Sequence, residues 1–265
     1  MPDAMSDALR PRSSLPRLLA TFAALAASSG CAASDRDVAS VKAYWMPAQV
    51  DGGVKITQGG VAGSGTRVRV DDDLGMGGES QGIFGAGMKV DNAWLTLEYM
   101  PFSFSGSDQP AQSFTFHGQN FAAGDHLKSD LGLETWHARL AAPLGDADGA
   151  LNAGIGAYWW DFDMKVADRD TGAQERRSFS RLLPAASLDG RASVLDHIGV
   201  GFDASFATLG GGRKLTDLAA FASYSYGSGF EADLGYREIH VALNEDTNDG
   251  TLIVRGPYFG VSWRF

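Results

Sequence analysis

Hydrophobic and polar residues alternate with a period of two along most of the chain beyond residue 40. The clearest example is residues 258–265, in which Phe259, Val261, Trp263 and Phe265 share one face and Tyr, Gly, Ser and Arg occupy the other. A period of two is the side-chain period of a β-strand. No long window shows the helical spacing of apolar positions, so the pattern predicts an all-β protein.

Gly, Asn, Asp and Ser interrupt the alternation and divide it into ten strands. Tight connections at 91–92, 145–149, 195–198 and 227–229 alternate with longer polar ones at 58–81, 106–126, 167–177, 209–216 and 244–250. Short turns at one end and long loops at the other are typical of transmembrane barrels. We therefore expect a closed antiparallel transmembrane β-barrel of ten strands, with eight as the alternative count. The expected strands are 41–57, 82–90, 93–105, 127–143, 150–166, 178–194, 199–208, 217–226, 230–243 and 251–265.

Periodicity alone does not say which face points inward. The apolar face is buried in a soluble barrel, whereas it meets lipid in an outer-membrane barrel with a polar interior. Here the polar face is rich in Gly and in charges of both signs, and Trp and Tyr gather near strand ends, as at membrane interfaces. Both features favour an apolar face toward lipid. The charges expected in the lumen are Lys89, Glu98, Arg139, Asp189, Arg191, Asp203, Glu231, Asp233, Arg237 and Arg264.

Three stretches of the chain resemble known outer-membrane proteins. Residues 256–265 resemble the terminal signal of bacterial outer-membrane barrels, carried here by Phe259, Val261, Trp263 and Phe265. Residues 68–75 and 129–133 resemble parts of a poorly characterised proteobacterial barrel family. The resemblance implies a barrel in the outer membrane of a Gram-negative bacterium, with membrane lipids and the barrel-insertion machinery as partners. It implies no catalytic residue set.

The first 33 residues have the composition of a secretory signal peptide. Arg10, Arg12 and Arg17 precede an apolar run over 18–27, which is too short to span a bilayer as a helix, and small residues follow it. Cys31 stands where lipoprotein signals place the cysteine that is lipidated, but Ser28 occupies the usual Leu position. Lipidation of Cys31 and ordinary cleavage after Ala33 both remain open. The barrel domain is expected over 34–265.

Charge and cysteine content narrow the function. The 32 acidic and 22 basic residues give a formal net charge of −10, which argues against a nucleic-acid partner. The single Cys excludes an internal disulfide framework and a cysteine-cluster metal site.

Several motifs suggest chemistry but lack its full residue set. Consecutive residues of an extended segment point to opposite sides, so the Asp71, Asp72 and Asp73 side chains cannot all converge on one cation. The acidic stretch 244–250 lacks the spacing of a calcium loop, and the Gly-rich stretch 59–65 lacks the Lys and helix of a phosphate loop. Asp161 and Asp163 share a strand face without an evident catalytic partner, and the five His residues are scattered. We expect no catalytic, metal or cofactor site.

The sequence thus predicts a non-enzymatic integral barrel of the outer membrane, acting structurally or through its surface loops. A small porin-like channel and a barrel hydrolase with His240 or His126 at its rim are the alternatives. A soluble periplasmic barrel around an apolar ligand is another, and it requires Phe202, Trp263 and Phe265 to lie in a sealed core. In the second long loop, residues 113–121 are expected to form a hairpin that extends the barrel beyond the membrane.

Overall fold

The computed structural model describes residues 38–265 except 59–64, 146–150, 211, 228 and 246. The predicted signal peptide and Cys31 lie outside the described residues. All regular structure in the described part is β, and no helix there is long and apolar enough to cross a membrane. The strands are β1 Ala39–Ile56, β2 Val68–Arg69, β3 Glu79–Val90, β4 Ala93–Asp108, β5 Phe114–Phe116, β6 Gln119–Phe121, β7 Leu127–Pro143, β8 Leu151–Asp168, β9 Gln174–Leu195, β10 Ile198–Gly210, β11 Arg213–Tyr226, β12 Phe230–Asn244 and β13 Asn248–Arg264.

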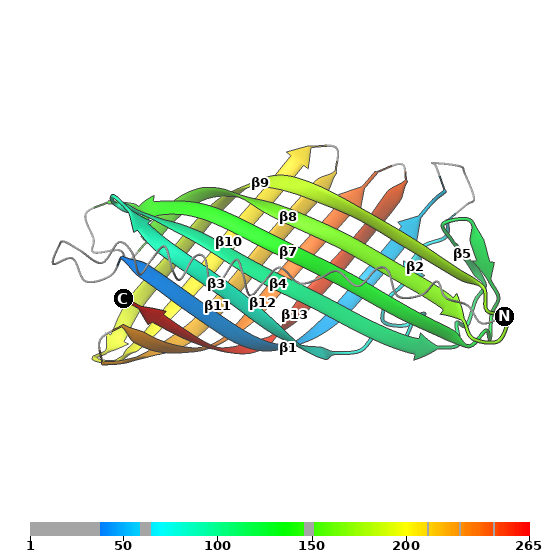
Figure 1. The fold of residues 1–265 in the computed structure, drawn as a ribbon, viewed down its shortest axis with the longest axis horizontal. Coiled ribbons are helices and arrows are strands. Elements are labelled where there is room, and N and C mark those ends of the chain that lie inside the picture. Colours follow the sequence, from blue (N-terminus) through cyan, green and yellow to red (C-terminus); the bar gives the residue numbers. More distant parts are fainter. Residues whose placement is uncertain (1–37, 59–64, 146–150, 211, 228, 246) are drawn as a thin grey trace, which may run out of the picture.

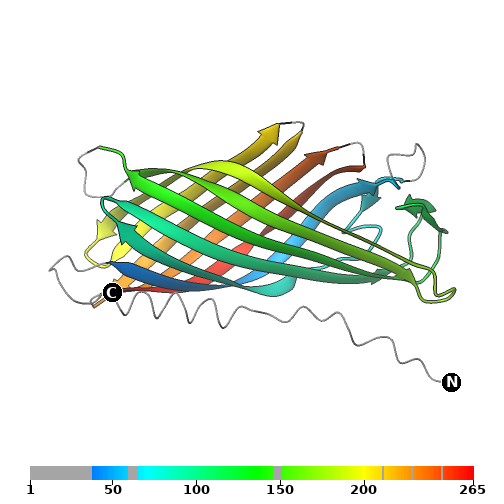
Figure 2. The same cartoon turned by 45° about the horizontal axis from the view of Figure 1, so that its top comes forward.

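Ten long strands form a closed antiparallel barrel (Figure 1). Each strand pairs with the next long strand in the chain, and β13 closes the barrel on β1 through pairs such as Trp45 with Phe259. The predicted fold class is confirmed, with ten strands rather than eight. The tight turns and the C-terminal residue lie at one end, here called the turn end, and the longer connections lie at the other, the loop end (Figures 1 and 2).

The direction of the apolar face reverses partway along the strands. On β8, Ile155 and Trp159 point outward and are 71% and 53% exposed, whereas Trp160 and Phe162, nearer the loop end, point inward and are buried. Asp161 and Asp163 then occupy the outward positions. The turn-end half is therefore apolar outside and polar inside, and the loop-end half is polar outside and apolar inside.

A row of large side chains marks this reversal. Tyr99, Trp136, Trp159 and Leu182 are cross-strand neighbours on β4, β7, β8 and β9. The next outward row toward the loop end contains Glu134, Asp161 and Ser180. Aromatic residues of this kind occupy membrane–water interfaces, so the row marks one edge of the lipid-facing surface.

The outward apolar residues on the turn-end side of that row form a belt around the barrel. Phe202, Trp263 and Phe265 are 38%, 53% and 36% exposed in it. This exposure contradicts the soluble alternative, which required all three in a sealed core. Exposing such an apolar surface to water would cost free energy, whereas exposing it to lipid would not. Other exposed members of the belt are Val41, Phe84, Met88, Leu95, Leu140, Ile155, Leu188, Val200, Phe206, Leu218, Tyr224, Phe230, Leu234, Tyr236 and Phe259.

An apolar core fills the lumen at the loop end. Met46, Met100 and Trp160 project into it from the barrel wall, and Leu74 packs into it from the loop after β2. The predicted hairpin over 113–121 forms as β5 and β6, but it makes a separate two-stranded sheet. It does not extend the barrel wall as expected, because Phe114, Phe116 and Phe121 bury themselves in this core.

Three of the predicted long loops are shorter than expected. The connections at 167–177, 209–216 and 244–250 shrink because β8 to β13 continue into them. The strand extensions lie beyond the belt, so their outward side chains are polar. Their residue composition therefore resembles that of loops. The loop over 58–81 also contains the short strand β2, which pairs with β1.

Candidate functional site

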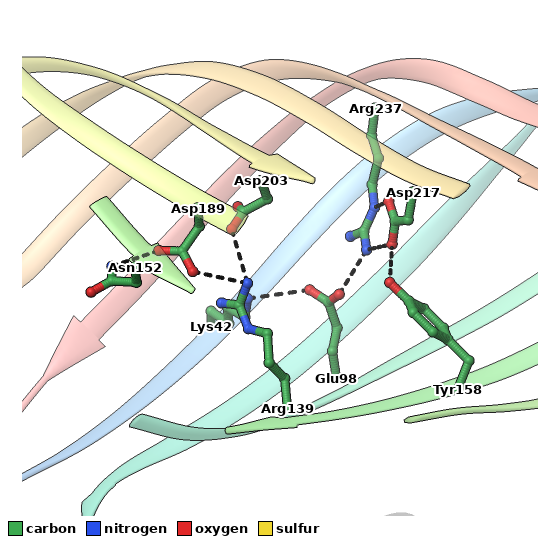
Figure 3. Close-up of polar contacts among 9 residues, drawn as sticks. All are labelled: Lys42, Glu98, Arg139, Asn152, Tyr158, Asp189, Asp203, Asp217 and Arg237. Carbon is green, nitrogen blue, oxygen red and sulfur yellow. Dashed lines mark hydrogen bonds and ion pairs between the residues drawn. The ribbon is translucent and has the colours of Figure 1, made fainter. Parts of the chain in front are cut away.

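The polar half of the lumen holds three groups of charged side chains. The first centres on Arg237 of β12, which is buried (Figure 3). Its Nε and Nη2 donate to the two carboxylate oxygens of Asp217 at 2.8 and 2.6 Å, and Nη2 also donates to Glu98 Oε2 at 2.7 Å. Lys42 Nζ lies 3.3 Å from the other Glu98 oxygen, and the Tyr158 hydroxyl donates to Asp217 at 2.9 Å. Five strands are thereby joined across the interior.

The second group centres on Arg139 of β7. Its Nη1 lies 3.1 Å from Asp189 of β9 and 3.5 Å from Asp203 of β10. The Asn152 amide of β8 donates to the second Asp189 oxygen at 2.8 Å (Figure 3). Charge-assisted bonds of this kind are stronger than neutral ones, so Arg139 holds β9 and β10 to β7, and Asp189 holds β8 through Asn152.

The third group lies nearer the turn end. Glu231 of β12 forms ion pairs with Arg191 and, at 3.5 Å, with Arg264. Asp233, two residues along β12, is 2% exposed. Lys89 lies at the turn end of β3. The three groups and Lys89 together contain six basic and six acidic residues, so their charges balance: Lys42, Lys89, Arg139, Arg191, Arg237 and Arg264 against Glu98, Asp189, Asp203, Asp217, Glu231 and Asp233.

A cavity of about 40 Å³ lies between the first two groups. Its lining includes Lys42, Glu98, Arg139 and His137. The His137 ring stacks on Tyr158 with centroids 3.9 Å apart, and its buried Nε2 has no partner among the described side chains and backbone groups. A space of this size holds about three water molecules.

All ten residues predicted as lumen charges lie in the polar, turn-end half of the lumen, and nine of them belong to the three groups. Lys42 and Asp217 are central to the network, but the sequence reading did not include them. Both lie in strands that were predicted, and counting positions by two from Tyr44 and from Ala219 would have placed each on the inner face. The two residues were therefore missed because the inward-facing positions of these strands were not assigned, and not because of their residue type.

The other sequence motifs do not assemble into a site. Arg69 forms ion pairs with Asp71 and Asp72, and its backbone N–H donates to the Asp73 carboxylate. Each of the three carboxylates therefore has Arg69 as a partner. Groups of acidic, His or Cys residues fit to hold a metal are absent from the part of the chain that the structure describes. Most of the Gly-rich stretch at 59–65 lies outside the described residues. In the acidic stretch over 244–250, Asn248 already begins β13.

The predicted rim histidines do not converge. His240 is exposed on the outer face of β12, while Asp163 on the outer face of β8 is paired with Arg176. Three strands separate β8 from β12. His126 pairs with Asp170 at 2.6 Å and His117 with Glu175 at 2.8 Å. Neither His126 nor His117 bonds to Ser or Cys among the described residues.

The C-terminal residues of the predicted signal are all on the belt. Phe259 and Trp263 are 51% and 53% exposed, and the Trp263 ring packs against Phe265 with centroids 5.1 Å apart. Val261 lies between them on the same face.

Solved structures similar to this fold are bacterial outer-membrane barrels. The outer-membrane protease OmpT from Escherichia coli aligns with a TM-score of 0.56 at 8% identity, covering 89% of this chain and all of that one. The translocator domain of the autotransporter NalP from Neisseria meningitidis aligns with a TM-score of 0.44 at 13% identity, covering 94% and 95%. No protein-family model and no curated protein matches the sequence. By fold, the chain is an outer-membrane β-barrel protein, and the belt is the surface that such a fold presents to lipid.

Proposed function

We propose that this protein is a sealed, non-enzymatic outer-membrane barrel that does not conduct solutes and acts through the part of the molecule beyond the loop-end edge of the belt. In outer-membrane barrels the short turns face the periplasm and the longer loops face outward. The loop end is then extracellular. The barrel anchors that surface in the membrane.

The observation that carries this proposal is a lumen closed by two different layers. Ion pairs cross the interior at the level of Glu98 and Arg237, and each of these residues is at most 8% exposed. Beyond them the apolar core around Met46, Met100 and Trp160 fills the lumen. A small barrel whose interior is filled by side chains is not a pore.

The channel alternative requires a continuous polar path, and the apolar core interrupts it. The hydrolase alternative draws on the fold shared with OmpT, which is a protease. At 8% identity that likeness concerns the fold alone. The loop-end half of the lumen is filled by apolar side chains such as Leu131 and Phe162, and this core of described residues contains no paired nucleophile and base of the kind that hydrolysis needs.

Single-channel recording in planar lipid bilayers tests the proposal. The full chain, with insertion verified by its heat-modifiable gel mobility, is expected to give no conductance steps. The double variant Glu98→Ala with Arg237→Ala is also expected to give no conductance steps, because the apolar core still closes the lumen between the ion pair and the loop end. Asp130→Ala, on the outer face of β7, serves as the control. Regular conductance steps from the unmodified protein would overturn the proposal.

A further inference from the structure

Strand β9 is longer than the neighbour that should cover it. Its pairing with β10 stops where Ala185 meets Ala207, whereas its pairing with β8 continues to Gln174. Residues 174–184 therefore have a strand on one side only. Figure 1 shows β9 running on toward the loop end past the end of the β10–β11 hairpin. Pro184 directly precedes Ala185, where the pairing with β10 ends, and proline lacks the N–H that a ladder needs.

The comparable edge on β4 is covered. Pairing of β4 with β3 stops at Tyr99, so the backbone of residues 100–108 also lacks a paired strand on that side. There, however, Gln81 donates to the Ser103 carbonyl at 2.7 Å, and the backbone N–H of Ser105 donates to Glu79 at 2.8 Å. For 174–184 of β9, the described residues supply one such contact, from the Arg181 side chain to the Ser180 carbonyl at 2.8 Å. A free edge of this length is a template for another strand.

A small apolar cavity of about 10 Å³ lies on the inner side of this edge. Phe179 of β9 lines it together with Trp160, Phe162 and Leu243. The Phe179 ring stacks on Phe162 with centroids 4.8 Å apart. Unlike its neighbours in the core, Phe179 is only partly buried, so part of its ring is available to a side chain that enters from the edge.

One arginine of this edge has no ion pair among the described residues. Arg176 is paired with Asp163, and Arg181 with Glu245. The Nε of Arg177 is buried and has no hydrogen-bond partner among the described residues. Arg177 and Phe179 are two residues apart and share the inner face, so the cross-strand neighbours of both on an added strand would share it too.

We infer that the free edge of β9 is a docking site for an extended segment of a partner polypeptide. The segment adds as a strand beside 174–184 and places an acidic side chain opposite Arg177 and an apolar one opposite Phe179. Backbone hydrogen bonds give such binding its affinity, and alternate side chains give its specificity. The inference rests on the proposed function in that it locates the interaction surface beyond the belt.

The test uses short synthetic peptides and the full chain in lipid nanodiscs, with affinity measured by fluorescence anisotropy. The probe alternates Thr with Asp and Phe. Two further versions carry N-methyl groups on alternate amides, one on each edge of the peptide strand. The unmodified peptide is expected to bind, and one N-methylated version is expected to lose binding while the other keeps it, because only one edge faces β9. Hydrogen exchange should slow within residues 174–184.

Variants assign the two side-chain contacts. Phe179→Ala is expected to weaken binding by about tenfold, while Phe206→Ala on the lipid face leaves it unchanged. Arg177→Glu should abolish binding of the Asp peptide and restore binding of a Lys peptide. The same change at Arg176, on the outer face, should do neither. Rescue by the Lys peptide shows that the Arg177 variant is folded.

Three outcomes would overturn the inference: no binding of any peptide, equal loss with both N-methylated versions, or a dimer of this chain that pairs through β9 and excludes the peptide. Each of these leaves the silent bilayer recordings standing. Conductance by the unmodified protein would instead overturn the sealed-barrel proposal, whatever the peptides do.

Discussion

Arg237 and Glu98 lie 139 residues apart in the chain and meet inside the barrel, where Arg237 Nη2 donates to Glu98 Oε2 at 2.7 Å. Strands β4 and β12 are not neighbours in the sheet, so this contact spans the lumen. It therefore ties opposite walls together, which backbone pairing cannot do.

Removing the carboxylate from this contact should destabilise the barrel. In Glu98→Gln, Arg237 keeps Asp217, but the partly buried Lys42 loses its ion pair. We expect a loss of about 3 kcal/mol in the free energy of unfolding, since breaking a buried ion pair from one side leaves a charge without compensation. Urea titration of the refolded protein measures it. Asp130→Asn is the control, and equal stability of both variants would contradict a structural role for the network.

The belt can be tested by placing a charge on it. Ile155 is 71% exposed on the outer face of β8, in the middle of the belt. Ile155→Arg should cost about 2–4 kcal/mol in unfolding free energy because the charge enters lipid. Ala167→Arg, on the same face of the same strand but beyond the belt, should cost close to nothing. If both changes were harmless, the belt would not face lipid.

One glycine is required by an aromatic ring on the next strand. A Cβ atom at Gly260 of β13 would overlap the ring of Tyr44 on β1, which packs across the seam that closes the barrel. Gly260→Ala should therefore destabilise the protein by about 1–3 kcal/mol. At Gly132 the nearest atoms would lie 3.8 Å from the new Cβ, so Gly132→Ala is the matched control. The temperature at which each variant loses its folded gel mobility distinguishes the two. Equal temperatures would mean that Tyr44 moves aside freely.

The rim should weaken in acid. The hydrogen bond from Arg181 is the main cause that lowers the pKa of Glu245 from 4.5 to about 2. A carboxyl with a depressed pKa in the folded state stabilises that state fully above its unfolded value. This contribution is lost as the pH falls from about 4.5 to about 2.

Stability measured across that range should therefore decline less in Glu245→Gln than in the unmodified protein. Glu238→Gln, on the outer face of β12, should retain the decline. A decline of the same size in all three proteins would show that Glu245 contributes nothing to acid sensitivity.

The alternation of side chains was enough to predict the ten strands and the closed barrel. It also placed Phe259 and Trp263 on one face, because a strand has a fixed period whatever surrounds it. The extent of β8 and β9 beyond the membrane was not predictable in the same way. There Asp161, Asp163 and Arg176 point outward into water, and a polar outward face next to a loop reads as part of the loop.

The ion-pair network was predictable by residue type but not by partner. The sequence reading placed Arg139 and Asp189 in one lumen, yet their contact depends on how β7 and β9 are staggered, which no local pattern encodes. The gap beside Phe179 has the same origin. It exists because β10 is shorter than β9, and each strand taken alone gives no sign of it.

The reversal of the apolar face along each strand also fixes how deep that strand sits. In a strand that alternates uniformly, a slip of two residues restores every side chain to its proper face. In β8, a two-residue slip toward the turn end would carry Asp161 to the level of Trp159 and bring a carboxylate into the belt. The slip in the opposite direction would raise Trp159 into water. The position of the reversal thus fixes the depth of each strand in the membrane. Neighbouring strands can pair in register at this position before the barrel closes.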